Sequence, residues 1–451
     1  MSITVSSLIL AALQTSTIVV GAGAPHQTIA EALAAAQPGD TIRVAAGTYA
    51  EHIVLDIPVV LIGERGAVLD GSNEGTVVIV EAGATISGFT IRNTGADQSR
   101  EDAGIMAVKA DSLRIENNTF EGVLFGIYIK ESDALTVVHN MITGKDIPIS
   151  LRGDGIRLWY CRGGTIADNT VVRSRDVVIW FSDSTGIFRN HVADSRYGLH
   201  YMYSDHNIFE DNEFIHNSVG AFIMYSNDIT FRRNIFADAR GTTGRGLGFK
   251  DTDSIVAERN VLVRNSIGIS IDNSPTTERI TNVFRNNTVA LNDLGVSLLP
   301  SVHSNEFVDN DFAANVQPVA VTGGGTALAN HWYNNYWSDY AGFDADRDGN
   351  GDTPFIHARL SDDLLAKHEA LRLFELSPAA AALNMLSRVL PLLEPAPLVI
   401  DSAPKMARGH ETARRRSTSA GTLAAALISL ASTLVAIRIA WTASRPGRST
   451  T

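Results

Sequence analysis

Residues 190–211 read NHVADSRYGLHYMYSDHNIFED, and residues 212–233 read NEFIHNSVGAFIMYSNDITFRR. Each stretch has 22 residues, opens with Asn, and carries an apolar run that begins eight residues later, at Gly198 or Gly220. The same Asn-x-apolar unit occurs at Asn118, Asn140, Asn169, Asn190, Asn212, Asn234, Asn260, Asn287 and Asn310. Self-similarity at a fixed period of this length is typical of a repeat protein, in which each unit contacts its neighbours.

The period favours an all-β fold, a right-handed parallel β-helix with coils of about 22 residues and a small helical or irregular C-terminal region. Short β runs broken by Asn, Gly or Asp suit strands that rise about 3.3 Å per residue. Asn fits the corners because it tolerates the left-handed conformation and its amide can hydrogen-bond between coils. Leucine-rich repeats would need more leucine, and a propeller would need about 40 residues per blade.

Composition excludes some functions. The chain of 451 residues has a net charge of -12, which argues against a nucleic-acid partner because such a surface needs a basic patch. The single cysteine, Cys161, cannot form an internal disulfide.

The two ends of the chain differ from the repeat. Residues 1–24 have no charged side chain and end in Ala-Gly-Ala, which predicts a secretory signal segment; the alternative is that TIVVGAG, residues 17–23, is a buried first strand. Residues 25–330 are predicted to be the β-helix, with a helix carrying Ile29, Leu33 and Ala36 on one face as its N-terminal cap.

Three further segments follow the repeat. Residues 331–405 are predicted to be a C-terminal cap with helical patches, and residues 406–419 a basic linker. Residues 420–440 begin with an uncharged apolar run of eighteen residues. That run reaches the length needed to span a bilayer, so we expect a membrane anchor; an amphipathic or Ala-rich helix on a disordered linker is the alternative.

One strand of each coil is expected to place unusual residues on the outside. If residues one and three after each Gly position point inward, residues two and four point outward. The outward pairs are then Tyr128/Lys130, Arg157/Trp159, Ile179/Phe181, His200/Met202, Phe222/Met224, Gly248/Lys250 and Ser270/Asp272. A contiguous apolar surface of this kind indicates a binding site, so Tyr128, Trp159, Phe181 and Phe222 are predicted to form a partner surface.

The same alignment predicts a metal site. Equivalent residues of adjacent parallel strands lie about 4.8 Å apart, so Met202 should lie against Met224, with His200 on the same face. Two thioethers and an imidazole suit Cu(I) better than Zn(II) or Mg(II). The alternative is that a loop covers this face and the methionines fill space.

A second metal motif lies near the end of the repeat. Asp344, Asp346 and Asp348 stand at alternate positions before Gly349, as in the first half of an EF-hand-like calcium loop, and Asn350 and Asp352 could add oxygens. No Glu stands at the twelfth position. A structural Ca²⁺ site and a solvated Asp-Gly turn both remain open.

Four stretches, in this order on the Asn-punctuated repeat, resemble the NosD family. They are RDVVIWFSDST (175–185), RYGLHYMYSDH (196–206), GAFIMYSND (220–228) and NNYWSDYAGFDADRDGNGD (334–352). The resemblance runs from about Pro25 to Met406. It implies a periplasmic right-handed parallel β-helix docked on an ABC-type ATPase and permease. Such a protein receives copper from a lipoprotein chaperone and helps to build the copper sites of nitrous oxide reductase. Cu(I) would be a transient cargo, with His200, Met202 and Met224 as candidate ligands.

Two other classes of function remain. Parallel β-helices often carry polysaccharide lyases, hydrolases and epimerases, which need clustered carboxylates with Arg, Lys or His. Asp154, Arg157, Lys130 and His200 are available, but an apolar stripe separates them and no paired carboxylates are expected on stacked coils. A structural adhesin or scaffold is the third class.

Overall fold

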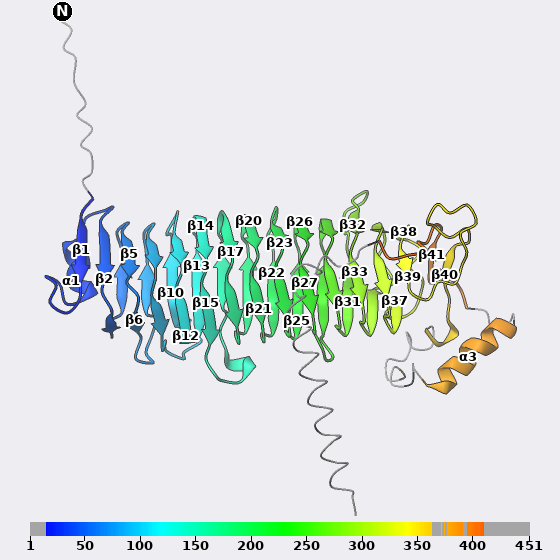
Figure 1. Ribbon diagram of the computed structural model, residues 1–451, viewed down its shortest axis with the longest axis horizontal. Coiled ribbons are helices and arrows are strands. Elements are labelled where there is room, and N and C mark those ends of the chain that lie inside the picture. The colour runs from blue at the N-terminus through cyan, green and yellow to red at the C-terminus, as the bar shows by residue number, and fades with distance from the viewer. Residues whose placement is uncertain (1–14, 363–370, 372–373, 375–376, 391–394, 410–451) are drawn as a thin grey trace, which may run out of the picture. The chain divides into compact units, whose positions relative to one another are not determined.

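The computed structural model describes residues 15–362, 371, 374, 377–390 and 395–409, and within them the chain winds into a parallel β-solenoid (Figure 1). Each coil passes in turn through three long sheets, here named A, B and C. This arrangement confirms the predicted all-β solenoid. Strands that neighbour each other in a sheet come from successive coils, so the pairing is parallel throughout these three sheets.

The three sheets hold nearly all the strands. Sheet A contains β1 Thr17–Val20, β2 Thr41–Val44, β5 Val60–Gly63, β8 Thr85–Ser87, β11 Arg114–Glu116, β14 Asp133–Val138, β17 Arg162–Ala167, β20 Asp183–Phe188, β23 Ile208–Glu210, β26 Asn227–Arg232, β29 Asp253–Glu258, β32 Asn282–Arg285, β35 Asn305–Val308 and β38 His331–Tyr333. Sheet B contains β3 Gly47–Tyr49, β6 Ala67–Asp70, β9 Thr90–Arg92, β12 Thr119–Val123, β15 Met141–Gly144, β18 Thr170–Val172, β21 His191–Ala193, β24 Glu213–Ile215, β27 Ile235–Ala237, β30 Val261–Val263, β33 Thr288–Ala290, β36 Asp311–Ala313 and β39 Tyr336–Trp337. Sheet C contains β4 Ile53–Leu55, β7 Val78–Val80, β10 Ala103–Val108, β13 Phe125–Lys130, β16 Ile156–Trp159, β19 Asp176–Trp180, β22 Tyr197–Met202, β25 Val219–Met224, β28 Arg245–Lys250, β31 Ile267–Asp272, β34 Leu294–Leu298 and β37 Gln317–Val321.

The core lies inside the coils because alternate residues of each strand point inward. Ile179, Tyr201 and Ile223 occupy equivalent positions on three successive strands of sheet C, and all three are fully buried. Because equivalent positions stack from coil to coil, the same residue class recurs at the period of the repeat.

Asn side chains join the coils at the corner between sheets A and B. Asn212 Nδ2 donates to the Ile187 carbonyl and to Oδ1 of Asn234, each at 2.9 Å, and Asn190 Nδ2 donates to Asn212 Oδ1 at 3.0 Å. The expectation that these Asn residues adopt the left-handed conformation is wrong. The preceding residue adopts it instead, as at Asp211 with φ 57°, so that the Asn side chain turns into the coil.

The N-terminal end of the solenoid is closed by the helix α1, Ile29–Ala35. Thr28 and Glu31 form a capping box, and the helix buries Ile29 and Ala32, with Leu33 packed against the core. The predicted boundary at residue 24 is wrong for the fold, because β1 pairs with β2 from Thr17 and buries Val20. Residues 1–14 of the predicted signal segment lie outside the described residues.

The solenoid also extends past the predicted end at residue 330. The strands β38 and β39 make a further coil, since Asn310 Nδ2 donates to Asn335 Oδ1 at 3.0 Å and continues the ladder. Beyond it, β40 Phe355–His357 pairs antiparallel with β41 Val399–Asp401, and α3 Pro378–Val389 supplies the predicted helical part. A short 3₁₀ helix, Ile149–Leu151, lies in the loop before β16.

Most of the predicted linker and all of the apolar run, residues 410–440, lie outside the described residues. Within the part of the chain that the structure describes, no helix has the length and apolarity to cross a bilayer.

Candidate functional site

The outer face of sheet C carries the candidate copper ligands in register. Met202 on β22 lies opposite Met224 on β25, and His200 lies opposite Phe222. All four side chains are half-buried. The strand register therefore places the two thioethers on neighbouring coils, with the imidazole two residues from Met202 along β22.

The methionines continue a column of large side chains. Trp159, Trp180, Met202, Met224 and Lys250 occupy equivalent positions on five successive strands. The Trp159 and Trp180 rings lie 5.3 Å apart between centroids. The column ends at Lys250, whose Nζ lies 3.7 Å from a carboxylate oxygen of Asp272, so the apolar part of this face spans four coils.

The His200 ring is held on three sides. Tyr197 stacks on it with centroids 4.8 Å apart, and Trp180 meets it edge-on at 4.9 Å. Its Nδ1 lies 3.3 Å from Oδ2 of Asp176. The side chain is 15% exposed, so only a small part of the ring is open to an external ligand.

Asp176 is a buried carboxylate with a full set of donors. Its side chain is 1% exposed, Arg196 donates to both of its oxygens, and the backbone N–H of Tyr197 donates to Oδ1 at 3.2 Å. Burial acts to raise the pKa of Asp176, but hydrogen bonds from His200 and Arg196 and the charge of Arg196 outweigh it and lower that pKa.

The predicted outward pair Ile179/Phe181 is wrong. Ile179 is fully buried, and Val178 and Trp180 occupy the positions opposite His200 and Met202. The register shifts between Asp176 and Val178, because β19 spans this stretch with one residue fewer than β22. A shift of one residue moves a side chain to the other face of the strand.

Phe181 belongs instead to an aromatic stack at the corner after sheet C. The rings of Tyr160, Phe181, Tyr203 and Tyr225 stack with successive centroid distances of 4.6, 5.0 and 4.9 Å. All four residues have a positive φ, and the three tyrosines are 37–54% exposed. The recurring aromatic-Ser pair in WFS, MYS and MYS is the sequence signal that could have revealed this stack.

Tyr128 does not form an exposed partner surface. It points outward from β13, yet it is only 2% exposed because Lys130 and Arg157 lie over its ring and Phe125 lies beside it. Glu101, from the preceding coil, holds Lys130 Nζ at 2.7 Å. Burial raises the pKa of Tyr128 far above its ordinary value.

The other two predicted surface residues remain on the outer face. Trp159 is half-buried, and Phe222 is half-buried with its ring over Gly248, where an added Cβ would lie 2.2 Å from the ring. Two buried donors on this face, Arg157 Nε and Trp180 Nε1, have no protein acceptor among the described residues. Water or an acceptor from outside the chain is needed to satisfy them.

Carboxylates do occur on stacked coils, contrary to the sequence expectation. Asp154 precedes β16 and Asp176 begins β19, and each pairs with an arginine of the following coil, Arg175 or Arg196. Burial raises the pKa of Asp154 to about 6, despite the opposing charge of Arg175. Both carboxylates are 1% exposed, which removes them from direct contact with a polymer substrate.

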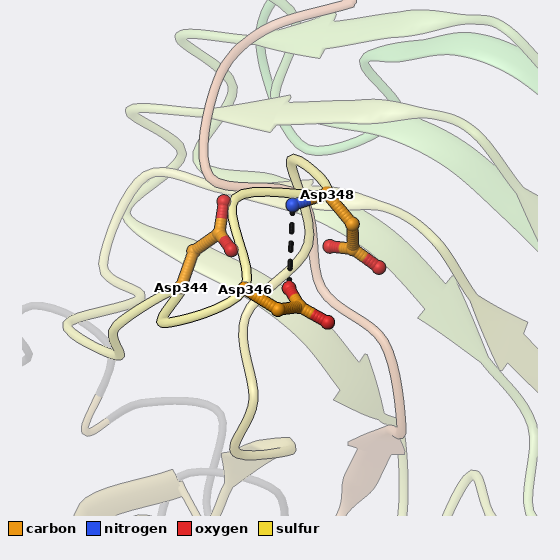
Figure 2. A group of neighbouring side chains, drawn as sticks. All are labelled: Asp344, Asp346 and Asp348. Atoms are coloured by element: carbon orange, nitrogen blue, oxygen red, sulfur yellow. Dashed lines mark hydrogen bonds between the residues drawn. The ribbon is translucent and has the colours of Figure 1, made fainter.

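The DADRDGNGD loop brings three carboxylates together (Figure 2). Oxygens of Asp344, Asp346 and Asp348 lie within 4.8 Å of one another, and Asp344 Oδ2 accepts from the Gly349 N–H at 3.0 Å. Asp352 lies across the loop, where Oδ2 accepts from the Ala345 N–H at 2.6 Å. Asn350 is engaged through its backbone in a bridge to Lys405. The loop geometry is compatible with an oxygen-ligated cation.

Comparison with protein families gives three matches. The model described as "Periplasmic copper-binding protein (NosD)" matches residues 138–342, which include the outer-face column from Trp159 to Lys250. A model described as "Right handed beta helix region" matches residues 74–188. A family of unknown function matches residues 17–76, the start of the solenoid.

Curated relatives cover most of the chain. A "Probable ABC transporter binding protein NosD" of Pseudomonas aeruginosa is 30% identical over 378 residues, 80% of this chain and 87% of the relative. One of the same description from Stutzerimonas stutzeri is 27% identical over 401 residues, 81% of this chain and 86% of the relative.

Among solved structures, the A-module of the Azotobacter vinelandii mannuronan C-5 epimerase AlgE6 aligns with 67% of this chain and 92% of its own. The identity is 14% and the TM-score is 0.47, a degree of similarity that supports no inference about activity.

Proposed function

Because this chain belongs to the NosD family, we propose that it is the periplasmic component of an ABC-type assembly that handles copper for the maturation of nitrous oxide reductase. In this proposal Cu(I) is a cargo that the protein receives from a lipoprotein chaperone and passes on. The solenoid provides the surface on which the cargo is held, beside the ATPase and permease.

The observation that carries the proposal is the register of Met202 and Met224. Two thioethers on adjacent coils, next to the imidazole of His200, form a soft donor set that favours Cu(I) over harder divalent ions. The donors lie half-buried on an outer face, where a partner protein can approach. An incomplete ligand set on an outer face suits an ion that must be released.

The apolar surroundings support docking of a protein partner at the same place. Trp180 and Phe222 border the methionines on sheet C, and Trp159 follows Trp180 in the same column. The stacked rings of Tyr203 and Tyr225 directly follow Met202 and Met224 in the chain. Aromatic residues and methionine are enriched at protein interfaces. We therefore place the copper-exchanging partner on this face.

The test is an anaerobic Cu(I) titration of the full chain against a competing chelator. We expect a dissociation constant near micromolar, roughly 8 kcal/mol of binding free energy. Met202→Leu combined with Met224→Leu removes the sulfurs while keeping side-chain volume, and should weaken binding at least about tenfold. Met106→Leu is the matched control, since Met106 is a half-buried residue on the outer face of the same sheet, at β10. Equal affinity in the double variant and the wild type rejects the copper site.

The competing function is a carbohydrate-active enzyme such as a polysaccharide lyase or epimerase. Its best support is the cluster of Asp176, Arg196, Tyr197 and His200 on sheet C. Turnover of pectin or alginate by the purified chain, abolished by His200→Gln, would favour the enzyme over the accessory role. We expect no turnover, because the Asp176 carboxylate of this cluster and the nearby Asp154 carboxylate are both buried in ion pairs with arginine.

A further inference from the structure

We propose that Asp176 is a positioning residue that fixes the tautomer and orientation of His200, so that Nε2 is the atom offered to Cu(I). This inference rests on the proposed copper-handling function and names how one of its ligands is prepared. It assigns a role to a buried residue that has no access to the ion itself.

The hydrogen bond between His200 and Asp176 determines which imidazole nitrogen carries the proton. Nδ1 of His200 lies 3.3 Å from Oδ2 of Asp176. An ionised carboxylate only accepts hydrogen bonds, so the imidazole must donate from Nδ1. A neutral imidazole with its proton on Nδ1 has a free lone pair on Nε2, which is the form that binds metals.

Asp176 is kept ionised and immobile by the next coil. Arg196 donates to both carboxylate oxygens, and the Tyr197 N–H donates to Oδ1. Arg196 directly precedes β22, and Tyr197 and His200 lie within it. The Asp176 carboxylate therefore links the start of β22 to the candidate ligand His200.

The aromatic neighbours remove the remaining freedom of the ring. Tyr197 covers one face of the imidazole, and the Trp180 ring lies nearly perpendicular to it, at 88°. A flip of the ring about the Cβ–Cγ bond would keep it in the same plane but would exchange Nδ1 with Cδ2, and the hydrogen bond to Asp176 would be lost. The site therefore selects one orientation before any metal arrives.

The short β19 strand explains how Asp176 reaches this place. Asp176, Val178 and Trp180 alternate along β19 and face outward, and the register shift after Asp176 sets it opposite Tyr197. The shift therefore sets the Asp176 carboxylate beside Tyr197 and within hydrogen-bond distance of His200. Val177 is buried at this shift.

The functional consequence concerns affinity. A carboxylate bound to the distal nitrogen of a ligating histidine orients the ring and makes the other nitrogen a stronger donor, and its loss typically weakens metal binding about 10–100-fold. We expect a weakening of that size for Asp176→Asn in the anaerobic Cu(I) titration of the full chain.

Asp154→Asn is the matched control. Asp154 is equally buried, it pairs with an arginine of the following coil in the same way, and it has no hydrogen bond to His200. The control variant should bind Cu(I) with wild-type affinity. Equal weakening by both substitutions would show a general structural effect and would overturn the positioning role.

A second readout needs no copper. Imidazole ¹⁵N chemical shifts of the metal-free full chain at neutral pH, with His200 assigned by the loss of its signal in His200→Gln, report which nitrogen carries the proton. We expect the Nδ1–H form in the wild type and in Asp154→Asn, and a mixture of tautomers in Asp176→Asn. An Nε2–H form in the wild type overturns the inference even if the variants fold poorly. If the tautomer is as expected but the methionine variants bind Cu(I) like the wild type, the proposed function fails while the positioning of His200 stands.

Discussion

Asp401 occupies the place that the Asn of one more coil would take beside Asn335. Its Oδ2 accepts from the backbone N–H and from Nδ2 of Asn335, each at 3.0 Å, and from Trp337 Nε1 at 3.0 Å. The carboxylate is fully buried, and its Oδ1 accepts from the Asn334 N–H at 3.1 Å. Asp401 lies in β41, 66 residues after Asn335 in the chain. The strand β41 therefore ends the Asn ladder with a carboxylate acceptor.

The first prediction follows from this cap. Asp401→Ala should lower the free energy of unfolding by about 3 kcal/mol, because several buried donors lose their acceptor. Asp401→Asn should cost less, about 1–2 kcal/mol, because the amide keeps one acceptor oxygen. It still destabilises the fold, because its NH₂ group then faces donors. Urea denaturation followed by circular dichroism measures both. Asp228→Asn, at an exposed corner residue, should stay within about 0.5 kcal/mol of the wild type. Wild-type stability in Asp401→Ala would show that β41 does not hold the end of the solenoid.

The second prediction concerns pH. The folded-state pKa of Asp154, about 6, lies above its ordinary value of 3.8, so the folded protein binds more protons than the unfolded chain between these two values. The free energy of unfolding contributed by this group therefore falls as pH rises from about 4 to 6, by at most about 3 kcal/mol.

Asp154→Asn cannot titrate, so the stability of the wild type relative to this variant should decrease over that interval and level off above it. Chemical denaturation of both proteins at intervals of half a pH unit gives the comparison. The lowered pKa of Asp176 has the opposite effect on the free energy of unfolding, which falls as pH decreases. That effect occurs only below about pH 4, where protonation of the carboxylate removes its stabilising contribution. A constant difference between the two proteins from pH 4 to 7 would contradict the assignment.

The third prediction tests the acidic loop as a calcium site. Three carboxylates within 4.8 Å repel one another, and a bound Ca²⁺ would offset that repulsion. Adding Ca²⁺ at a hundred times its dissociation constant should stabilise the fold by about 2.7 kcal/mol, read as a rise in Tm that EDTA reverses. The triple variant Asp344→Asn, Asp346→Asn, Asp348→Asn should not respond, and Mg²⁺ should have a smaller effect because it prefers a more rigid site. No shift in the wild type would leave the loop as a solvated Asp-Gly turn.

The fourth prediction concerns residues 420–440. Leu and Ile supply most of the favourable transfer free energy of this segment, and its Ala, Ser and Thr content makes insertion weak. Expressed without the transporter, the full chain should fractionate partly with the inner membrane, whereas a chain ending at Arg408 should be soluble in the periplasm. If the two fractionate alike, the segment is not an anchor.

The sequence by itself determined the repeat, the parallel β-solenoid and the neighbouring positions of Met202 and Met224. These features follow from local rules: strand alternation has a period of two, and the spacing of 22 residues between Asn190, Asn212 and Asn234 stacks equivalent positions. In a coil of unchanged length, the outward-pointing residues can be identified directly from the amino-acid sequence.

Only the tertiary structure decided which residues lie beneath and around that face. The shorter β19 strand turned Ile179 inward and moved Phe181 into the corner stack, because one missing residue reverses the alternation. The contacts of Tyr128 with Arg157, of His200 with Asp176 and of Asn335 with Asp401 join different coils or distant segments. No local pattern encodes such pairs, since they depend on how the coils stack and on which side chains meet in the space between them.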